Sequence, residues 1–124
     1  SAAGMNSPPR LRDYLGHILE AIEYIHRYPA NLTETTFVSK ENRLVQDAVI
    51  RNFEIIGEAS HHIERRHPEF LTAHPDLPLL NAYDMRNALA HGYFRVDLAR
   101  VWTTIQQDLP QLHQHLSTAL QELT

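Results

Sequence analysis

The spacing of its apolar residues constrains this chain more than any other feature. Over most of the sequence they recur at steps of three and four, as they do on one face of an amphipathic helix. Between residues 9 and 28 a single stripe of this kind runs through Leu11, Leu15, Ile18, Ile22 and Ile25. No segment shows the two-residue alternation of a strand. The sequence therefore predicts an all-α fold, with a first helix over 9–28 that ends before Pro29.

A second helix is predicted over residues 40–66, after a turn-rich connector. Ser39 is a partial N-terminal cap for this helix, and Pro68 is expected to close it. Gly57 lies inside the pattern, where close packing against another helix explains it more easily than a break does. The expected apolar positions are Leu44, Val45, Ala48, Val49, Ile55, Ile56, Ala59 and Ile63.

Two further helices complete the predicted architecture. Residues 67–78 contain three prolines and read as a loop, with room for one short helical turn. Helical spacing resumes over 79–91, and Gly92 stands where a C-terminal cap belongs. A fourth helix begins near Asp97, a good N-cap, and Pro110 should kink it or divide it in two. We therefore expect a four-helix bundle of the up-and-down type.

Length and composition suit one compact domain that is not built for a membrane. The 124 residues contain no cysteine, no internal repeat and no apolar run of the roughly 20 residues that a membrane span requires. The first four residues, Ser-Ala-Ala-Gly, precede Met5 and are expected to be an expression scar, which leaves 5–124 as the domain. No secretory signal is recognisable, so a cytoplasmic location is the default expectation.

The charge of the chain argues against broad nonspecific binding of polyanions. Its formal net charge is −4, so any phosphate site must be local. Ten of the eleven basic residues are Arg, whose forked guanidinium suits phosphate, although a genome-wide preference for Arg explains this equally well. Three pairs of arginines are candidates for guiding RNA, but a solvated surface is the simpler interpretation of each: Arg10 and Arg12, Arg65 and Arg66, and Arg95 and Arg100.

The stretch "RNALAHGY" gathers four chemically active side chains at the end of the predicted third helix. Asn87 and His91 lie four residues apart and face the same way, and the long side chain of Arg86 can reach the same area. Tyr93 follows just beyond Gly92. A cation, an imidazole and an amide suit metal-free cleavage of RNA, in which the substrate's own 2′-hydroxyl attacks. A simple helix cap and a surface network remain the alternative interpretation.

Four sequence blocks resemble the HepT branch of the HEPN superfamily. They are "RDYLGHILEAIEYI", "QDAVIRNFEIIGEAS", "MRNALAHGYF" and "VDLARVWTTIQQDLPQL", in the order of that family and across nearly the whole chain. The resemblance implies a homodimeric helical toxin of a HepT/MntA toxin–antitoxin pair, with the motifs of both protomers in one cleft. It implies cleavage of RNA, with transfer RNA as the substrate class, and neither cofactor nor metal. One departure is Leu79, where relatives often carry tryptophan.

The same resemblance assigns roles to individual residues. Arg86 and His91 match the catalytic pair of the family, Asn87 matches the polar residue beside the Arg, and Tyr93 matches the tyrosine that a MntA-like nucleotidyltransferase adenylylates. The chemistry agrees, because imidazole is a general acid or base near neutral pH and Arg stabilises a phosphorane. The expected product carries a 2′,3′-cyclic phosphate. The alternative is a non-catalytic HEPN module that binds and positions a nucleotidyltransferase.

The remaining histidines and aromatic residues favour structural roles. His61 and His62 point about 100° apart on a helix, and His113 and His115 about 200° apart, so neither pair can chelate one ion. The sequence thus predicts no metal site. Four aromatic residues are expected in the core or at a dimer interface rather than as platforms for RNA bases: Tyr14, Tyr24, Phe53 and Trp102.

Overall fold

A computed structural model describes residues 10–77 and 97–123 of the chain. Every regular element in these residues is a helix, which confirms the all-α prediction. The predicted third helix, over 79–91, lies outside the described residues. In chain order the elements are α2 (Leu11–Ile25), α3 (Glu34–Phe37), the 3₁₀ turn η1 (Lys40–Asn42), α4 (Arg43–Arg66), α5 (Pro68–Ala73), α7 (Leu98–Thr103), the π-helical turn η3 (Thr104–Asp108) and α8 (Leu109–Glu122).

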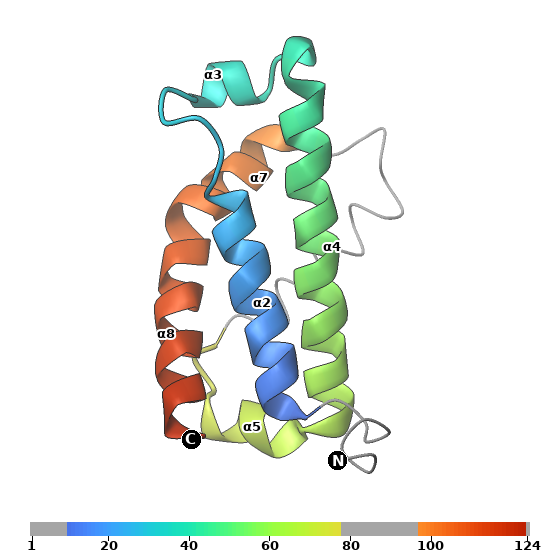
Figure 1. Cartoon of the computed structure of the whole chain (residues 1–124), viewed down its shortest axis with the longest axis vertical. Coiled ribbons are helices and arrows are strands. Elements are labelled where there is room, and N and C mark those ends of the chain that lie inside the picture. Colours follow the sequence, from blue (N-terminus) through green and yellow to red (C-terminus); the bar gives the residue numbers. More distant parts are fainter. Residues whose placement is uncertain (1–9, 78–96, 124) are drawn as a thin grey trace, which may run out of the picture.

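Three long helical segments form the body of the molecule (Figure 1). They are α2, α4 and the consecutive elements α7, η3 and α8, which together are called the C-terminal rod below. Helix α2 lies between α4 and α8 and packs against both. It runs antiparallel to α4, so the start of α2 lies beside the end of α4. The short helix α5 crosses this end of the bundle, while α3 and α7 meet at the opposite end. In the described part of the chain, no helix is both long enough and apolar enough to span a bilayer.

Helix α2 forms because its apolar stripe is buried on two sides. Leu15, Ile18 and Ile22 have no exposed surface. The helix begins where the backbone N–H of Arg10 donates to Asp13 Oδ2 over 2.8 Å, one half of a capping box. It ends at Ile25, three residues earlier than predicted.

The connector between α2 and α4 is more ordered than its sequence suggests. Thr33 caps the short helix α3 by accepting from the N–H of Thr36, and Phe37 at its end is fully buried. The amide of the buried Gln46 donates to the carbonyls of both Phe37 and Ser39, each over 2.7 Å. Ser39 caps as predicted, with its hydroxyl accepting from Glu41 N–H, but the turn it caps is 3₁₀ rather than α.

Helix α4 follows the predicted apolar pattern only after its first turns. Ile56 and Ile63 are fully buried and Gly57 sits inside the unbroken helix, whereas Leu44 is 87% exposed and Ala48 is also exposed. The prediction for these two residues was wrong because they lie one turn apart on the outer side of α4, whereas Gln46 and Val49 of the same turns are buried. Helix α4 is also longer than α2. At 1.5 Å per residue its 24 residues span about 36 Å against about 22 Å for the 15 of α2. Its first turns rise past the end of α2 (Figure 1).

The proline-rich segment after α4 contains a helix rather than only a loop. Helix α4 ends at Arg66, and Pro68 opens α5 instead of merely closing the helix before it. Proline is favoured in a first helical turn because no intrahelical bond needs its missing N–H there. Phe70 anchors this helix in the core at 6% exposure.

The C-terminal rod changes from α-helical to π-helical hydrogen bonding just before Pro110. An interruption at this proline was predicted from the sequence. Asp97 caps α7 by accepting from Arg100 N–H over 3.1 Å, as predicted. In the π-helical turn the N–H of Leu109 donates to the carbonyl of Thr104, five residues back. Pro110 has no N–H, so neither residue supplies a backbone donor to the carbonyl of Ile105. His26 Nε2 lies 3.2 Å from that carbonyl oxygen and replaces the missing donor.

The four predicted structural aromatics do not all behave alike. Tyr14 and Phe53 are core residues at 4% and 1% exposure. Trp102 is half-buried, with ring centroids 5.4 Å from Phe37 and 5.7 Å from Tyr28. Tyr24 is 48% exposed, so its place in a dimer interface stays a prediction.

Candidate functional site

The four residues predicted to carry the chemistry lie outside the described residues. Arg86, Asn87, His91 and Tyr93 belong to the segment 78–96, as does Leu79, the departure from the family pattern. The structure therefore does not test whether these four residues lie close together. Their assignment stays a prediction from the sequence, and the described residues are analysed below for sites of their own.

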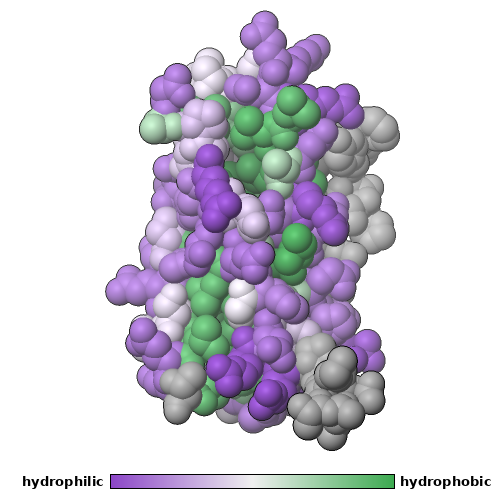
Figure 2. Space-filling model, viewed as in Figure 1, coloured by the Kyte–Doolittle hydropathy of each residue, from purple (hydrophilic) through white to green (hydrophobic). Residues whose placement is uncertain are grey.

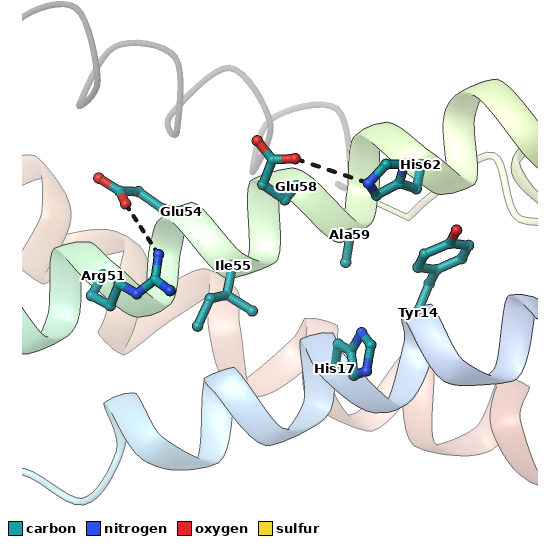
Figure 3. A pocket seen from close by; sticks show the side chains of 8 residues that line it. All are labelled: Tyr14, His17, Arg51, Glu54, Ile55, Glu58, Ala59 and His62. Atoms are coloured by element: carbon teal, nitrogen blue, oxygen red, sulfur yellow. Dashed lines mark ion pairs between the residues drawn. The ribbon is translucent and has the colours of Figure 1, made fainter. Parts of the chain in front are cut away.

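A pocket opens between α2 and α4 (Figure 3). It has a volume of about 390 Å³. Helix α2 contributes two residues and α4 contributes six. The lining residues are Tyr14, His17, Arg51, Glu54, Ile55, Glu58, Ala59 and His62.

Helical period explains why α4 supplies so much of this pocket. Arg51, Ile55, Glu58 and His62 follow one another at steps of three and four, so they share one side of the helix. The apolar pattern had already predicted Ile55 and Ala59 to face the interior. It missed the polar members, although their spacing was readable in "RNFEIIGEASHH", because each polar residue alone suggested a solvated face.

The ion pairs at the rim of the pocket are long and exposed. Arg51 Nη1 lies 3.7 Å from Glu54 Oε2, and His62 Nε2 lies 4.0 Å from Glu58 Oε2. The side chain of Arg51 is 71% exposed and that of Glu58 is 52% exposed. Pairs of this kind contribute at most about 1 kcal/mol to stability. These two ion pairs favour certain orientations of the rim side chains without fixing them.

One end of the pocket is closed by a rigid aromatic pair. The rings of Tyr14 and His62 stack with centroids 5.2 Å apart and an interplanar angle of 18°. Arg66 Nη1 donates to the hydroxyl of Tyr14 over 2.9 Å, which joins the end of α4 to the start of α2. Ile55 and Ala59 project toward α2 as an apolar floor (Figure 3). The pocket thus has one fixed end, an apolar base and a mobile charged rim.

This arrangement suits binding better than catalysis on its own. The pocket offers a guanidinium, two imidazoles and an apolar floor, with two carboxylates at its rim. The guanidinium can meet an anionic group and the floor an apolar or aromatic body. Within 10–77 and 97–123, no three His, Asp or Glu side chains come close enough together to hold a metal ion.

The predicted arginine pairs are partly brought together by the antiparallel packing. Arg10 and Arg12 stand at the start of α2, and Arg65 and Arg66 at the end of α4, so both pairs lie at one end of the bundle. Arg100 lies exposed on α7, and its partner Arg95 is outside the described residues. The exposure of these side chains agrees with solvated faces, and their role in guiding RNA stays a prediction.

Comparison with known proteins decides the family. The family model described as "Ribonuclease HepT-like" matches residues 18–119, most of the chain. The chain belongs to this family. The match spans α4, α5, α7, η3 and most of α8, and it also covers the segment that carries Arg86 and His91. No solved structure matches the chain significantly.

Individual relatives agree with this assignment. A protein of Thermococcus cleftensis named "Probable ribonuclease HepT" is 40% identical over 101 residues, which cover 82% of this chain and 87% of that protein. A "Putative RNase" of Caldanaerobacter subterraneus is 32% identical over 90% of this chain and 95% of its own length. A Methanocaldococcus jannaschii protein named "Gamma-glutamylcyclotransferase and putative RNase" is 39% identical over 89% of this chain. The aligned part is only 47% of that longer protein.

Proposed function

We propose that this chain is a metal-independent endoribonuclease and the toxin of a toxin–antitoxin pair, with transfer RNA as its substrate class. The observation that carries the proposal is the family match over 18–119 together with an intact Arg86-x4-His91 motif inside it. The relatives carry ribonuclease names, which supports the same activity. The chemistry needs no cofactor, because RNA supplies its own nucleophile.

The proposed reaction follows from two side chains and the substrate. The 2′-hydroxyl of RNA attacks the adjacent phosphorus, and His91 takes the hydroxyl proton as general base. The 5′-oxygen leaves with a proton from a second acid, and the products are a 2′,3′-cyclic phosphate and a 5′-hydroxyl. Arg86 stabilises the added charge on the phosphorane, while Asn87 orients His91 or donates to a phosphate oxygen.

A homodimer would supply the second acid. Two copies of the motif in one cleft place one His91 on each side of the phosphate, so that one acts as base and the other as acid. Light scattering at micromolar concentration tests this part. A monomer there would contradict a shared cleft.

We further propose that Tyr93 is the regulatory hydroxyl. It stands two residues after His91, and a MntA-like nucleotidyltransferase would attach AMP to it. The added phosphate carries negative charge to the place where the RNA phosphate must bind, and the nucleotide blocks access. Inhibition would follow from repulsion and bulk together.

Cleavage of RNA in the presence of EDTA is the first experiment. Wild-type protein should cut RNA, and His91→Ala and Arg86→Ala should abolish both cleavage and growth arrest while keeping a helical circular-dichroism spectrum. Growth arrest retained in either variant would move the chemistry to other residues. Wild-type protein that binds a nucleotidyltransferase without cutting RNA would instead be a non-catalytic helical module.

The regulatory residue is tested separately by Tyr93→Phe. This variant should keep ribonuclease activity, because the hydroxyl has no part in the reaction, and should escape modification. Each form is co-expressed with the cognate nucleotidyltransferase, and intact mass and growth are followed. If Tyr93→Phe still gains the mass of AMP and is still neutralised, another residue is modified.

A further inference from the structure

We propose that the pocket between α2 and α4 binds one nucleotide of an RNA strand, with Arg51 holding its phosphodiester at one end, Ile55 and Ala59 supporting its base or sugar, and His17 hydrogen-bonding to that base or sugar at the other end. This inference rests on the proposed ribonuclease function and adds a binding subsite made of other residues. The pocket lies in the described part of the chain, apart in sequence from the Arg86–Tyr93 motif. Its role is to position substrate and not to take part in bond cleavage.

Arg51 has the free donors that a phosphate contact needs. Its closest approach to Glu54 is 3.7 Å, which is longer than a hydrogen bond. Its side chain is 71% exposed, so the guanidinium can turn its fork toward a ligand. In Figure 3 it stands at the end of the pocket opposite Tyr14.

His17 faces the same space from the other helix. Among the described residues the structure gives its ring no hydrogen-bond or ion-pair partner, and the side chain points from α2 toward α4 (Figure 3). A ring N–H can therefore donate to an oxygen of the base or sugar without breaking an existing contact. Arg51 and His17 together approach a ligand from two helices.

The rest of the pocket fits the uncharged part of a nucleotide. A volume of about 390 Å³ falls in the lower part of the range of small-molecule sites. Ile55 and Ala59 form an apolar floor, and the stacked Tyr14 and His62 close one end. A flat base or a sugar can lie on such a surface without leaving a buried polar group unpaired.

The carboxylates decide between a strand and a free nucleotide. Glu54 and Glu58 point outward from α4, away from α2, at the rim of the pocket (Figure 3). Their charge opposes any anion and opposes a doubly charged terminal phosphate more than a singly charged phosphodiester. At the single phosphate that Arg51 holds, the rim therefore favours a phosphodiester over the terminal phosphate of free AMP.

The deciding measurement is the affinity for a short single-stranded RNA carrying fluorescein and 2′-O-methyl groups, which cannot be cut because its nucleophile is blocked. Fluorescence anisotropy gives Kd at several salt concentrations. Arg51→Gln should weaken binding about three- to tenfold and lower the slope of log K against log salt by about 0.7, the loss of one phosphate contact. His17→Gln should weaken binding in the same direction.

Arg43→Gln is the matched control. Arg43 lies on the same helix, is 72% exposed against 71% for Arg51, and pairs with a carboxylate, Asp47, at 3.7 Å, as Arg51 does with Glu54. Its replacement should leave Kd within about twofold, since it lies outside the pocket. Glu54→Gln should tighten binding because it removes the competing carboxylate. Thermal unfolding followed by circular dichroism confirms that each variant is folded.

Several results would overturn the inference. They are no binding by the wild-type protein, equal effects of Arg51→Gln and Arg43→Gln, weaker binding by Glu54→Gln, and displacement of the strand by AMP at concentrations near the Kd of the strand. The fate of the proposed function is read separately, from cleavage of unmodified RNA. Binding through Arg51 without cleavage would contradict the ribonuclease function and support the subsite. Cleavage with no effect of Arg51→Gln on binding would support the ribonuclease function and contradict the subsite.

Discussion

The first and last helices of the bundle solve the same packing problem in different ways. In α2 the apolar residues Leu15, Ile18 and Ile22 follow at steps of three and four, and an uninterrupted α-helix buries all of them completely. In the C-terminal rod, Val101, Ile105 and Leu109 follow at two successive steps of four. An α-helix rotates such a series by about 40° at each step, and α2 buries Tyr14, Ile18 and Ile22 in spite of the same rotation.

The π-helical turn corrects this rotation. A turn closed by a bond from residue i to i+5 takes up close to one residue more than an α turn. Val101, Ile105 and Leu109 all lie at 2% exposure or less. The comparison teaches that two different backbone windings can bury the same apolar spacing, and that the π turn occurs where Pro110 already weakens the α ladder.

Truncating one buried isoleucine in each of the two helices should have the largest effect on the free energy of unfolding and should show how the helices differ. Ile22→Ala and Ile105→Ala each remove the same side chain from a fully buried site. We expect Ile22→Ala to lower the free energy of unfolding by about 3–5 kcal/mol and Ile105→Ala by about 2–3 kcal/mol, because the irregular rod can relax into the cavity. Urea unfolding measures both. Equal losses would show that the π turn is as rigid as α2.

A smaller effect should come from the imidazole that serves the π turn. His26→Ala removes the donor to the Ile105 carbonyl and should destabilise the fold by about 1 kcal/mol. In a Pro110→Ala background the same change should have an effect near zero, since the backbone N–H groups of residues 109 and 110 can then serve both carbonyls. A double-mutant cycle gives the coupling directly. Full additivity would mean that Pro110 does not create the need for His26.

The smallest effect should come from the exposed start of α4. Leu44→Gln replaces an apolar side chain that is 87% exposed, so the free energy of unfolding should change by less than about 0.5 kcal/mol. Ile63→Gln, on the buried part of the same helix, provides the contrast and should unfold the protein or nearly so. A loss above about 1 kcal/mol for Leu44→Gln would contradict the exposure of this turn.

The sequence predicted the helices well and several of their ends: α4 ends at Arg66 and Asp97 caps α7, as expected, whereas α2 ends three residues earlier than predicted. The stripes of α2, of most of α4 and of α8 came directly from the sequence, because burial on one face leaves an unambiguous period. The failures at Leu44 and Ala48 arose because both fit the same helical period as the buried Val49. Only the packing reveals that they lie on the exposed side of α4.

Short helices and the pocket were harder to predict for a different reason. The four residues of α3 and the six of α5 are too few to show a period, and each is held by a cap or one buried aromatic side chain. The pocket depends on Tyr14 and His17 meeting α4 across the helix pair, which only the packing determines. The assignment of Arg86 and His91 rests on residue chemistry and on the family resemblance, and it stays a prediction.

The two side chains that hold backbone carbonyls differ in when they can act as the chain folds. Gln46 reaches Phe37 across nine residues, whereas His26 reaches Ile105 across 79. Closing the longer loop is less favourable by about 2 kcal/mol of chain entropy. The connector can therefore become ordered as soon as the first turns of α4 exist, from local sequence alone. The π turn has to wait for nearly the whole chain, so its winding is selected last, by a core that is already assembled.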